Sequence, residues 1–268
     1  MAELIGMELV EEFIESVIMT GRLKPPHSPV SVLLIASAES GKTSVAGNKK
    51  SSAIACFTDV TGRGLIEICK QSPEVSHIVL NDLVAIMSHR QSVNRYTQSM
   101  INAVTEEGIS ALAMPDGIEI VANGRRGIIA CLTTDLAQDG RSWWNKIGLA
   151  SRLLPFSFAH PGTLTIKIKD AIDNGKVDKG KKDILKVPRI PMDVKFPEYF
   201  VRKVRRMADE KAKELKDPTG YRRLKQFRAL ICGHALRRRS HKAEVNKADL
   251  DFVERVFPYI SYDKVVQL

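Results

Sequence analysis

Residues 36–43 have the composition of a phosphate-binding turn. They read Ala36-Ser-Ala-Glu-Ser-Gly41-Lys42-Thr43 and match the pattern G-x-x-x-x-G-K-[ST] except at its first glycine. In such a turn, backbone N–H groups converge on phosphate oxygens, the lysine neutralises the β- and γ-phosphates, and the last hydroxyl can hold Mg²⁺. We therefore predict a site for a nucleoside triphosphate and Mg²⁺, formed by Ser37, Ala38, Glu39, Ser40, Gly41, Lys42, Thr43 and Ser44.

Two features of this turn depart from the pattern. Ala36 replaces the first glycine, so we expect it to take a glycine-like backbone shape, at a cost of about 1 kcal/mol if its φ is positive. Gly47 and Asn48 predict that the following helix is short. A chance Gly-Lys-Thr in a loop is the alternative, but a buried strand directly precedes the turn, and this context favours nucleotide binding.

At this point the sequence resembles an AAA+ ATPase. His77-Ile-Val-Leu-Asn81-Asp82 is similar to the Walker B strand, which ends in Asp-Glu in that family: one carboxylate orients the magnesium shell, the other polarises the attacking water. Either Asn81 and Asp82 occupy both positions, or Asp82 serves the metal and Leu83 occupies the position of the base. Both assignments predict slow hydrolysis, because a shortened or absent carboxylate fails to reach the water.

The order of later segments resembles the AAA+ subgroup with an insert in the second core helix. This subgroup includes minichromosome-maintenance helicases and bacterial enhancer-binding activators. A helix-like segment from Gln98 to Gly108 is followed by a predicted hairpin over residues 109–121 and by a strand that ends near Thr133 and Thr134. The resemblance implies that Thr133 or Thr134 is sensor 1, which contacts the γ-phosphate or the lytic water.

The resemblance also implies two catalytic arginines. Arg152 follows a serine and precedes a predicted strand, as the family's arginine finger does, and would act on the nucleotide of a neighbouring subunit. Arg222 aligns with sensor 2 of the lid helix, with Arg223 and Arg228 as alternatives. Each of these residues, taken alone, could instead be an ordinary helix-end or solvated arginine; their order along the chain favours the family roles.

The charge of the chain is strongly asymmetric. Its net charge of +10 divides into −2 for residues 1–160 and +12 for residues 161–268. Such an excess favours a polyanionic partner, although a basic surface can also serve solubility or an acidic protein. The candidate nucleic-acid contacts are Arg125 and Arg126 at the predicted hairpin tip, and Arg237, Arg238 and Arg239 at a helix end, where they could also complement the helix dipole.

The hydrophobic pattern predicts an α/β fold: a parallel-sheet P-loop core with an inserted hairpin and a small all-α lid domain. We expect an N-terminal amphipathic helix in residues 1–24, the nucleotide-binding core in 25–160, a basic linker in 161–196 and the helical lid in 197–268. No apolar run approaches the ~20 residues of a membrane span, and the acidic N-terminus is unlike a secretory signal, so we expect a soluble, cytoplasmic protein.

These features together predict an ATP-binding AAA+ module that assembles with itself into a ring or filament, with a hexamer expected. Its expected task is ATP-dependent DNA work such as replication, helicase action or helicase loading, with a phage or mobile element as a possible source. The alternative is a nucleotide-gated assembly factor that hydrolyses ATP slowly or not at all and recruits a protein partner. A third, weaker alternative is a basic scaffold that binds no nucleotide.

Overall fold

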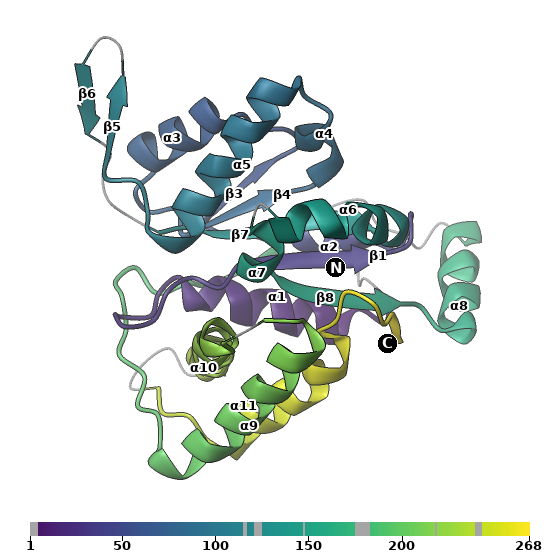
Figure 1. Cartoon of the computed structure of the whole chain (residues 1–268). Coiled ribbons are helices and arrows are strands. Elements are labelled where there is room, and N and C mark those ends of the chain that lie inside the picture. The colour runs from purple at the N-terminus through teal and green to yellow at the C-terminus, as the bar shows by residue number, and fades with distance from the viewer. Residues whose placement is uncertain are drawn as a thin grey trace.

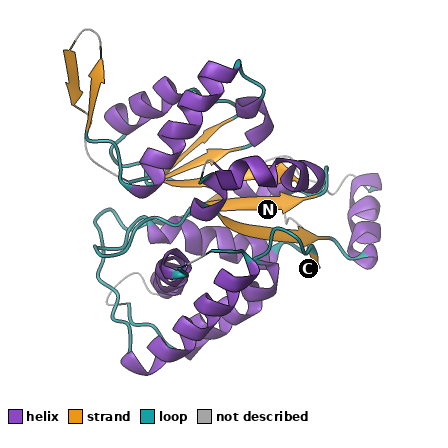
Figure 2. Cartoon of the chain, in the orientation of Figure 1, coloured by secondary structure: helices purple, strands orange, loops and turns teal. Residues whose placement is uncertain are grey.

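A computed structural model describes residues 5–114, 117–120, 125–146, 148–174, 183–217, 219–238 and 243–268. Its centre is a six-stranded, all-parallel sheet with the order β10-β8-β1-β7-β4-β3 (Figures 1 and 2). The strands are β1 (Val32–Ala36), β3 (Ile54–Phe57), β4 (His77–Leu80), β7 (Gly127–Thr133), β8 (Leu154–Ala159) and β10 (Val266–Gln267). β1 and β4 are buried along their whole length, as expected of strands covered on both faces.

Helices cover the sheet and form the connections between its strands. They are α2 (Lys42–Gly47), α3 (Gly62–Gln71), α4 (Leu83–Met87), α5 (Gln91–Glu106), α6 (Thr134–Lys146) and α7 (Leu149–Arg152). α2 is six residues long and ends at Gly47, so the prediction of a short helix after the turn is confirmed. None of the described helices is both long and apolar enough to cross a membrane.

The N-terminal helix lies between the sheet and the C-terminal helices. α1 (Glu8–Thr20) places Phe13 on Phe156 of β8, with ring centroids 4.2 Å apart. Its other side packs against α10 (Tyr221–Arg238), which in turn packs against α9 (Glu198–Glu214) and α11 (Lys247–Val256). After α11 and a short 3₁₀ turn, η1 (Phe257–Tyr259), the chain returns to the sheet as β10. The sheet and the helical domain are therefore joined at both ends of the chain.

A hairpin and a single helix project from this body (Figure 1). The hairpin, β5 (Ala111–Met114) and β6 (Gly117–Ile120), pairs antiparallel and confirms the insert predicted between α5 and β7. α8 (Gly162–Asp173) lies in the stretch expected to be a linker and has no buried residue. Beyond it, β9 (Asp183–Ile184) pairs with β2 (Lys49–Lys50) beside α2.

A buried polar network ties α1, α10 and α11 together. Asp249 accepts two hydrogen bonds from Arg238, both 2.7 Å, and lies 2.7 Å from Nδ1 of His234. Burial alone would raise the pKa of Asp249, but the hydrogen bonds with His234 and Arg238 hold it below its ordinary value. Asp249 also completes the capping box of α11 with Asn246, so it serves two elements at once.

Candidate nucleotide-binding site

The phosphate-binding turn lies at the carboxyl edge of the sheet, between the end of β1 and the start of α2. Two of its residues have left-handed backbone: Glu39 has φ of 59° and Gly41 has φ of 77°. The expectation of a glycine-like shape at Ala36 is wrong, because Ala36 continues the parallel ladder with β7 and the chain bends only after it. An added Cβ at Gly41 would meet no atom within 4 Å, so the backbone angle is what requires glycine there.

Lys42 reaches back across the mouth of the turn. Its Nζ donates a hydrogen bond to the carbonyl oxygen of Ser37 at 2.9 Å, and only 8% of the residue is exposed. Burial lowers the pKa of Lys42, while the nearby charge of Asp82 opposes that shift. The ammonium group is thus held where a phosphate oxygen can replace the carbonyl as its partner.

Asn81 and Asp82 follow β4 at the same edge of the sheet. Thr43 Oγ1 lies 3.5 Å from the carbonyl oxygen of Asn81. The Asn81 side-chain Oδ1 is buried without a hydrogen-bond partner and faces α2 near Gly47. Asp82 caps α4, since its Oδ1 accepts a hydrogen bond from the backbone N–H of Val84 at 2.8 Å. The polar oxygens at this edge therefore include one buried acceptor that has no hydrogen-bond partner among the described residues.

β7 pairs with β1 and ends beside the turn. Thr133 pairs in register with Ala36, the residue just before the turn, so the sensor 1 candidate stands at the same edge. Thr134 is the first residue of α6. Cys131 lies two residues before Thr133 on β7. Burial raises the pKa of its thiol to about 12, so the thiol stays protonated and packs against the backbone of Lys42.

His160 is a residue of this site that sequence reasoning missed. It follows β8, the neighbour of β1, and its Nε2 lies 2.8 Å from the carbonyl oxygen of Ser40 within the turn. Its Nδ1 and the Ser40 hydroxyl are both buried without a hydrogen-bond partner. The position of His160 in the sequence could have predicted this. The carboxyl ends of adjacent parallel strands meet at one edge of a sheet, so a histidine directly after β8 lies near the turn that follows β1.

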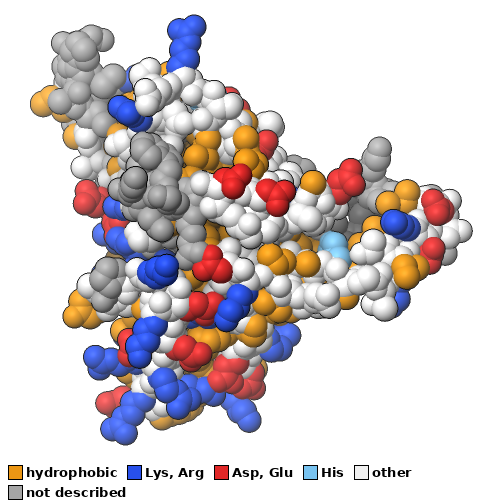
Figure 3. Space-filling model, turned by 45° about the vertical axis from the view of Figure 1, so that its right-hand side comes forward, with side chains coloured by type: hydrophobic (Ala, Val, Ile, Leu, Met, Phe, Trp, Pro, Cys, Tyr) orange, Lys and Arg blue, Asp and Glu red, His pale blue; other side chains and the backbone are white. Residues whose placement is uncertain are grey.

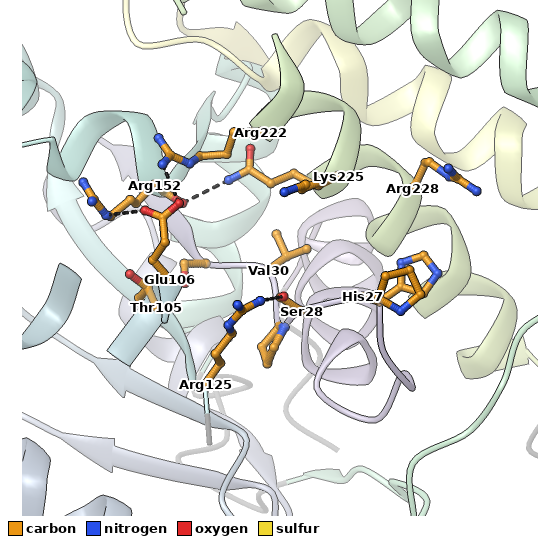
Figure 4. A pocket seen from close by; sticks show the side chains of 14 residues that line it. His27, Ser28, Val30, Thr105, Glu106, Arg125, Arg152, Arg222, Lys225 and Arg228 are labelled. Carbon is orange, nitrogen blue, oxygen red and sulfur yellow. Dashed lines mark hydrogen bonds and ion pairs between the residues drawn. The ribbon is translucent and has the colours of Figure 1, made fainter. Parts of the chain in front are cut away.

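Arg152 and Arg222 lie near the amino ends of the strands, away from the turn, and Figure 4 shows both beside Glu106. Arg152 ends α7 directly before β8, and Leu154 of β8 pairs with Val32 at the start of β1. The five residues of β1 separate that point from the turn by about 16 Å. The structure brings the two arginines to a common partner, Glu106, and not to the turn of their own subunit.

The two alternatives to Arg222 have structural partners. Arg223 is buried, with 1% of its side chain exposed, and its guanidinium donates to Gln226 Oε1 at 2.8 Å. Arg228 stands over the ring of Phe196, 5.0 Å from its centroid. Arg222 is 32% exposed and is the one of the three in contact with Glu106.

The predicted nucleic-acid residues have unequal surroundings. Arg125 and Arg126 stand at the base of the hairpin and not at its tip, because they follow β6 and lead into β7. Arg125 is exposed, whereas Arg126 is only 5% exposed. Arg237 pairs with Glu15 of α1 at 2.6 Å and Arg238 with Asp249, so both are engaged within the fold. Arg239 lies outside the described residues.

The fold is similar to a solved structure of a full-length MCM homologue from Methanopyrus kandleri, with a TM-score of 0.50 and 12% sequence identity. The match covers 95% of this chain and 55% of that chain, so this chain spans about half of its neighbour's length. The likeness confirms the predicted fold class, an α/β core with a parallel sheet followed by a helical domain. No protein-family model matches the sequence, and no curated protein matches it.

Proposed function

We propose that this chain is an AAA+ module that binds ATP in the turn at residues 37–44 and works as an assembly of identical subunits on DNA. The observation that carries the proposal is the turn itself: a left-handed Gly41, a buried Lys42 whose ammonium group donates to a single carbonyl among the described residues, and polar strand ends beside it. The backbone amides and Lys42 would hold the β- and γ-phosphates, and Thr133, which pairs with Ala36 just before the turn, would contact the γ-phosphate.

The residues beside Lys42 fit a magnesium ion that arrives with the nucleotide. Thr43 supplies a hydroxyl, and the unpartnered Asn81 Oδ1 and the exposed Asp82 carboxylate supply the oxygen ligands that Mg²⁺ prefers. A bound ion would neutralise charge on the β- and γ-phosphates. Asp82 has one oxygen committed to the α4 cap, so in this proposal it holds the metal shell and turnover is slow.

The position of the two arginines supports assembly. Arg152 and Arg222 lie at the far end of the strands from their own phosphate turn, so in this proposal they act on the nucleotide of another subunit. A planar guanidinium is suited to gripping phosphate oxygens as charge develops on them. The proposed assembly is a ring or filament, with a hexamer as the expected size.

The DNA-binding part of the proposal is supported by exposed arginines. Arg125 stands at the base of the projecting hairpin, and Arg202, Arg205 and Arg206 are exposed on α9. Basic side chains are numerous over the helical domain, where acidic ones also occur, in the lower part of Figure 3. Contacts of this kind neutralise backbone phosphates without reading bases.

Calorimetric titration with ATP and Mg²⁺ tests the proposal. Wild type should saturate, and Lys42→Ala should weaken binding at least about tenfold, because it removes a charge that pairs with phosphate. Lys50→Ala, which removes an exposed lysine eight positions along the chain, is the matched control and should bind like wild type. Folded wild type that gives no saturation with adenine or guanine nucleotides would remove the proposal.

The second candidate function is a nucleotide-gated switch that recruits a protein partner. The specific observation in its favour is the pair Asn81 and Asp82, of which one is an amide and the other caps a helix. Turnover measured with and without single- and double-stranded DNA separates the two functions. DNA-stimulated turnover that Lys42→Ala abolishes supports the DNA-acting ATPase; tight ATP binding without turnover supports the switch.

A further inference from the structure

A cationic cavity opens between α5, α7, α10 and the loop before β1. Its volume is about 330 Å³, and it is lined by five cationic side chains, Arg125, Arg152, Arg222, Lys225 and Arg228, against a single carboxylate, Glu106 (Figure 4). Glu106 is the last residue of α5 and points between Arg152 and Arg222. The cavity therefore has an excess of positive charge around one internal anion.

Glu106 holds both arginines at once. Its Oε1 accepts from Arg222 at 2.5 Å, and its Oε2 lies 2.7 Å from Nε of Arg152. Arg222 also donates to Ser151 Oγ at 2.7 Å, and Arg152 to the Gly148 carbonyl at 2.7 Å. Both guanidinium groups are thus fixed in one place by the carboxylate and by nearby oxygens.

The contact between Glu106 and Arg152 is incomplete. The two atoms attract as an ion pair, and among the described residues both Nε and Oε2 are buried and have no hydrogen-bond partner. A buried polar atom that lacks a hydrogen bond gains free energy from a better partner. Burial alone would raise the pKa of Glu106, but Arg222 first and Arg152 second hold it below its ordinary value, so the carboxylate stays charged.

We propose that Glu106 is a built-in competitor for the phosphate groups of a nucleotide carried by a second copy of this chain. The carboxylate occupies Arg152 and Arg222 in the separate subunit, and incoming phosphates must displace it before the arginines can grip them. This inference rests on the proposed function, since it assigns a regulator to the same intersubunit contact. A carboxylate and a phosphate repel in one cavity, so loss of the Glu106 charge strengthens phosphate binding.

Glu106→Gln is the direct test, and Glu107→Gln is its matched control. Glu107 is the adjacent residue, is exposed, and loses the same charge. Light scattering with ATP and Mg²⁺ over a concentration series should show that Glu106→Gln assembles at about tenfold lower protein concentration than wild type or Glu107→Gln. A purely structural role of Glu106 gives the opposite sign, because unpaired arginines would weaken the interface.

A second arm separates this inference from the proposed function. In the Lys42→Ala background the phosphate turn is weakened, so a change in the binding of inorganic tripolyphosphate that depends on Glu106 reports on the cavity. Adding Glu106→Gln to that background should tighten tripolyphosphate binding about tenfold, and adding Glu107→Gln should not. Glu106→Ala, checked for folding by circular dichroism, should act in the same direction if Glu106→Gln is unstable.

The outcomes are distinct. Unchanged or weaker binding of tripolyphosphate, together with unchanged or weaker assembly in folded Glu106 variants, overturns the role of Glu106. Absence of ATP binding by wild type overturns the proposed function, while the tripolyphosphate arm still decides the inference about the cavity.

Discussion

His77, at the start of β4, is a fully buried side chain at the amino edge of the sheet. Its Nε2 lies 3.2 Å from the carbonyl oxygen of Val30, and its Nδ1 lies 3.2 Å from Ser76 Oγ. Burial, helped by the charge of Arg22, lowers the pKa of His77 from 6.5 to about 4. The folded protein therefore holds a neutral imidazole at a pH where the unfolded chain binds a proton.

Part of the pH dependence of the protein's stability should therefore come from His77. As the pH falls below 6.5 the unfolded chain takes up the proton first, so the free energy of unfolding drops until the folded His77 also titrates near pH 4. Over that window the loss is about 3 kcal/mol. Urea unfolding from pH 7 to pH 4 measures it. His77→Gln should remove this part of the slope, and His89→Gln, at a partly exposed position, should retain it; equal slopes in both variants would contradict the assignment.

The site residues that could be predicted are those with local signals. These residues follow or end recognisable buried strands, and the parallel sheet brings the ends of those strands together. They are Lys42, Thr43, Asn81 and Thr133. Glu106 and Arg222 are 116 positions apart in the sequence, so no local sequence pattern predicts that they pair. The assignments of catalytic roles stay predictions until the nucleotide experiments are done.

Among the elements, α1 and α10 approach each other very closely at Gly233. A Cβ added there would lie 2.8 Å from Thr20 Cγ2 and closer still to the carbonyl oxygen of Ser16. Because the nearest atom belongs to the α1 backbone, the helices would have to separate.

Gly233→Ala should lower the free energy of unfolding by about 1–3 kcal/mol through overpacking, although alanine is the better helix former. Gly162→Ala is the matched control, since an added Cβ at Gly162 in α8 meets nothing within 4 Å, and it should be neutral or slightly stabilising. Thermal and urea unfolding of both variants supply the comparison. Equal stability of Gly233→Ala and wild type would mean that α1 and α10 are not held this tightly.

Elements were predictable where hydrophobicity and turn residues agree. The strand that begins at His77 and the short helix after the phosphate-binding turn are both present, as β4 and α2. α8 was missed because its sequence, Thr-Leu-Thr-Ile-Lys-Ile-Lys, alternates in the manner of a strand and is surrounded by lysine and glycine. β10 is two residues long and exists only through its pairing with β8, so no local pattern could reveal it.

Over the whole molecule, the positive excess of the C-terminal half is partly neutralised by folding. Arg237 and Arg255 pair with acids of α1, Arg238 pairs with Asp249, and Lys203 pairs with Glu254. The exposed arginines of α9 are left as the main candidate surface for a polyanion. A prediction from charge counts alone could not separate these two groups, because two of the four pairs use acids of α1 at the other end of the chain and two use acids of the C-terminal half itself.

Replacing Arg202, Arg205 and Arg206 with alanine should therefore weaken binding to double-stranded DNA. The slope of log affinity against log salt should fall in magnitude by up to about 2.7, because each lost phosphate contact contributes about 0.9. Removing three exposed lysines elsewhere, Lys24, Lys167 and Lys169, controls for total charge and should change the slope less. Fluorescence anisotropy over a salt series measures both, and an equal loss in the two triple variants would place DNA binding elsewhere.

The insertion of α1 between the sheet and α10 limits how this subunit can convert ligand binding into movement. A helical domain hung from one connecting segment could swing freely, but here α10 is packed against α1, whose Phe13 is stacked on β8, and β10 fastens the far end of the chain to the same strand. Movement of the helical domain relative to the sheet would require these packed surfaces to separate. Displacement of whole subunits costs less free energy. In such an assembly we therefore expect ligand binding to rotate one protomer against the next.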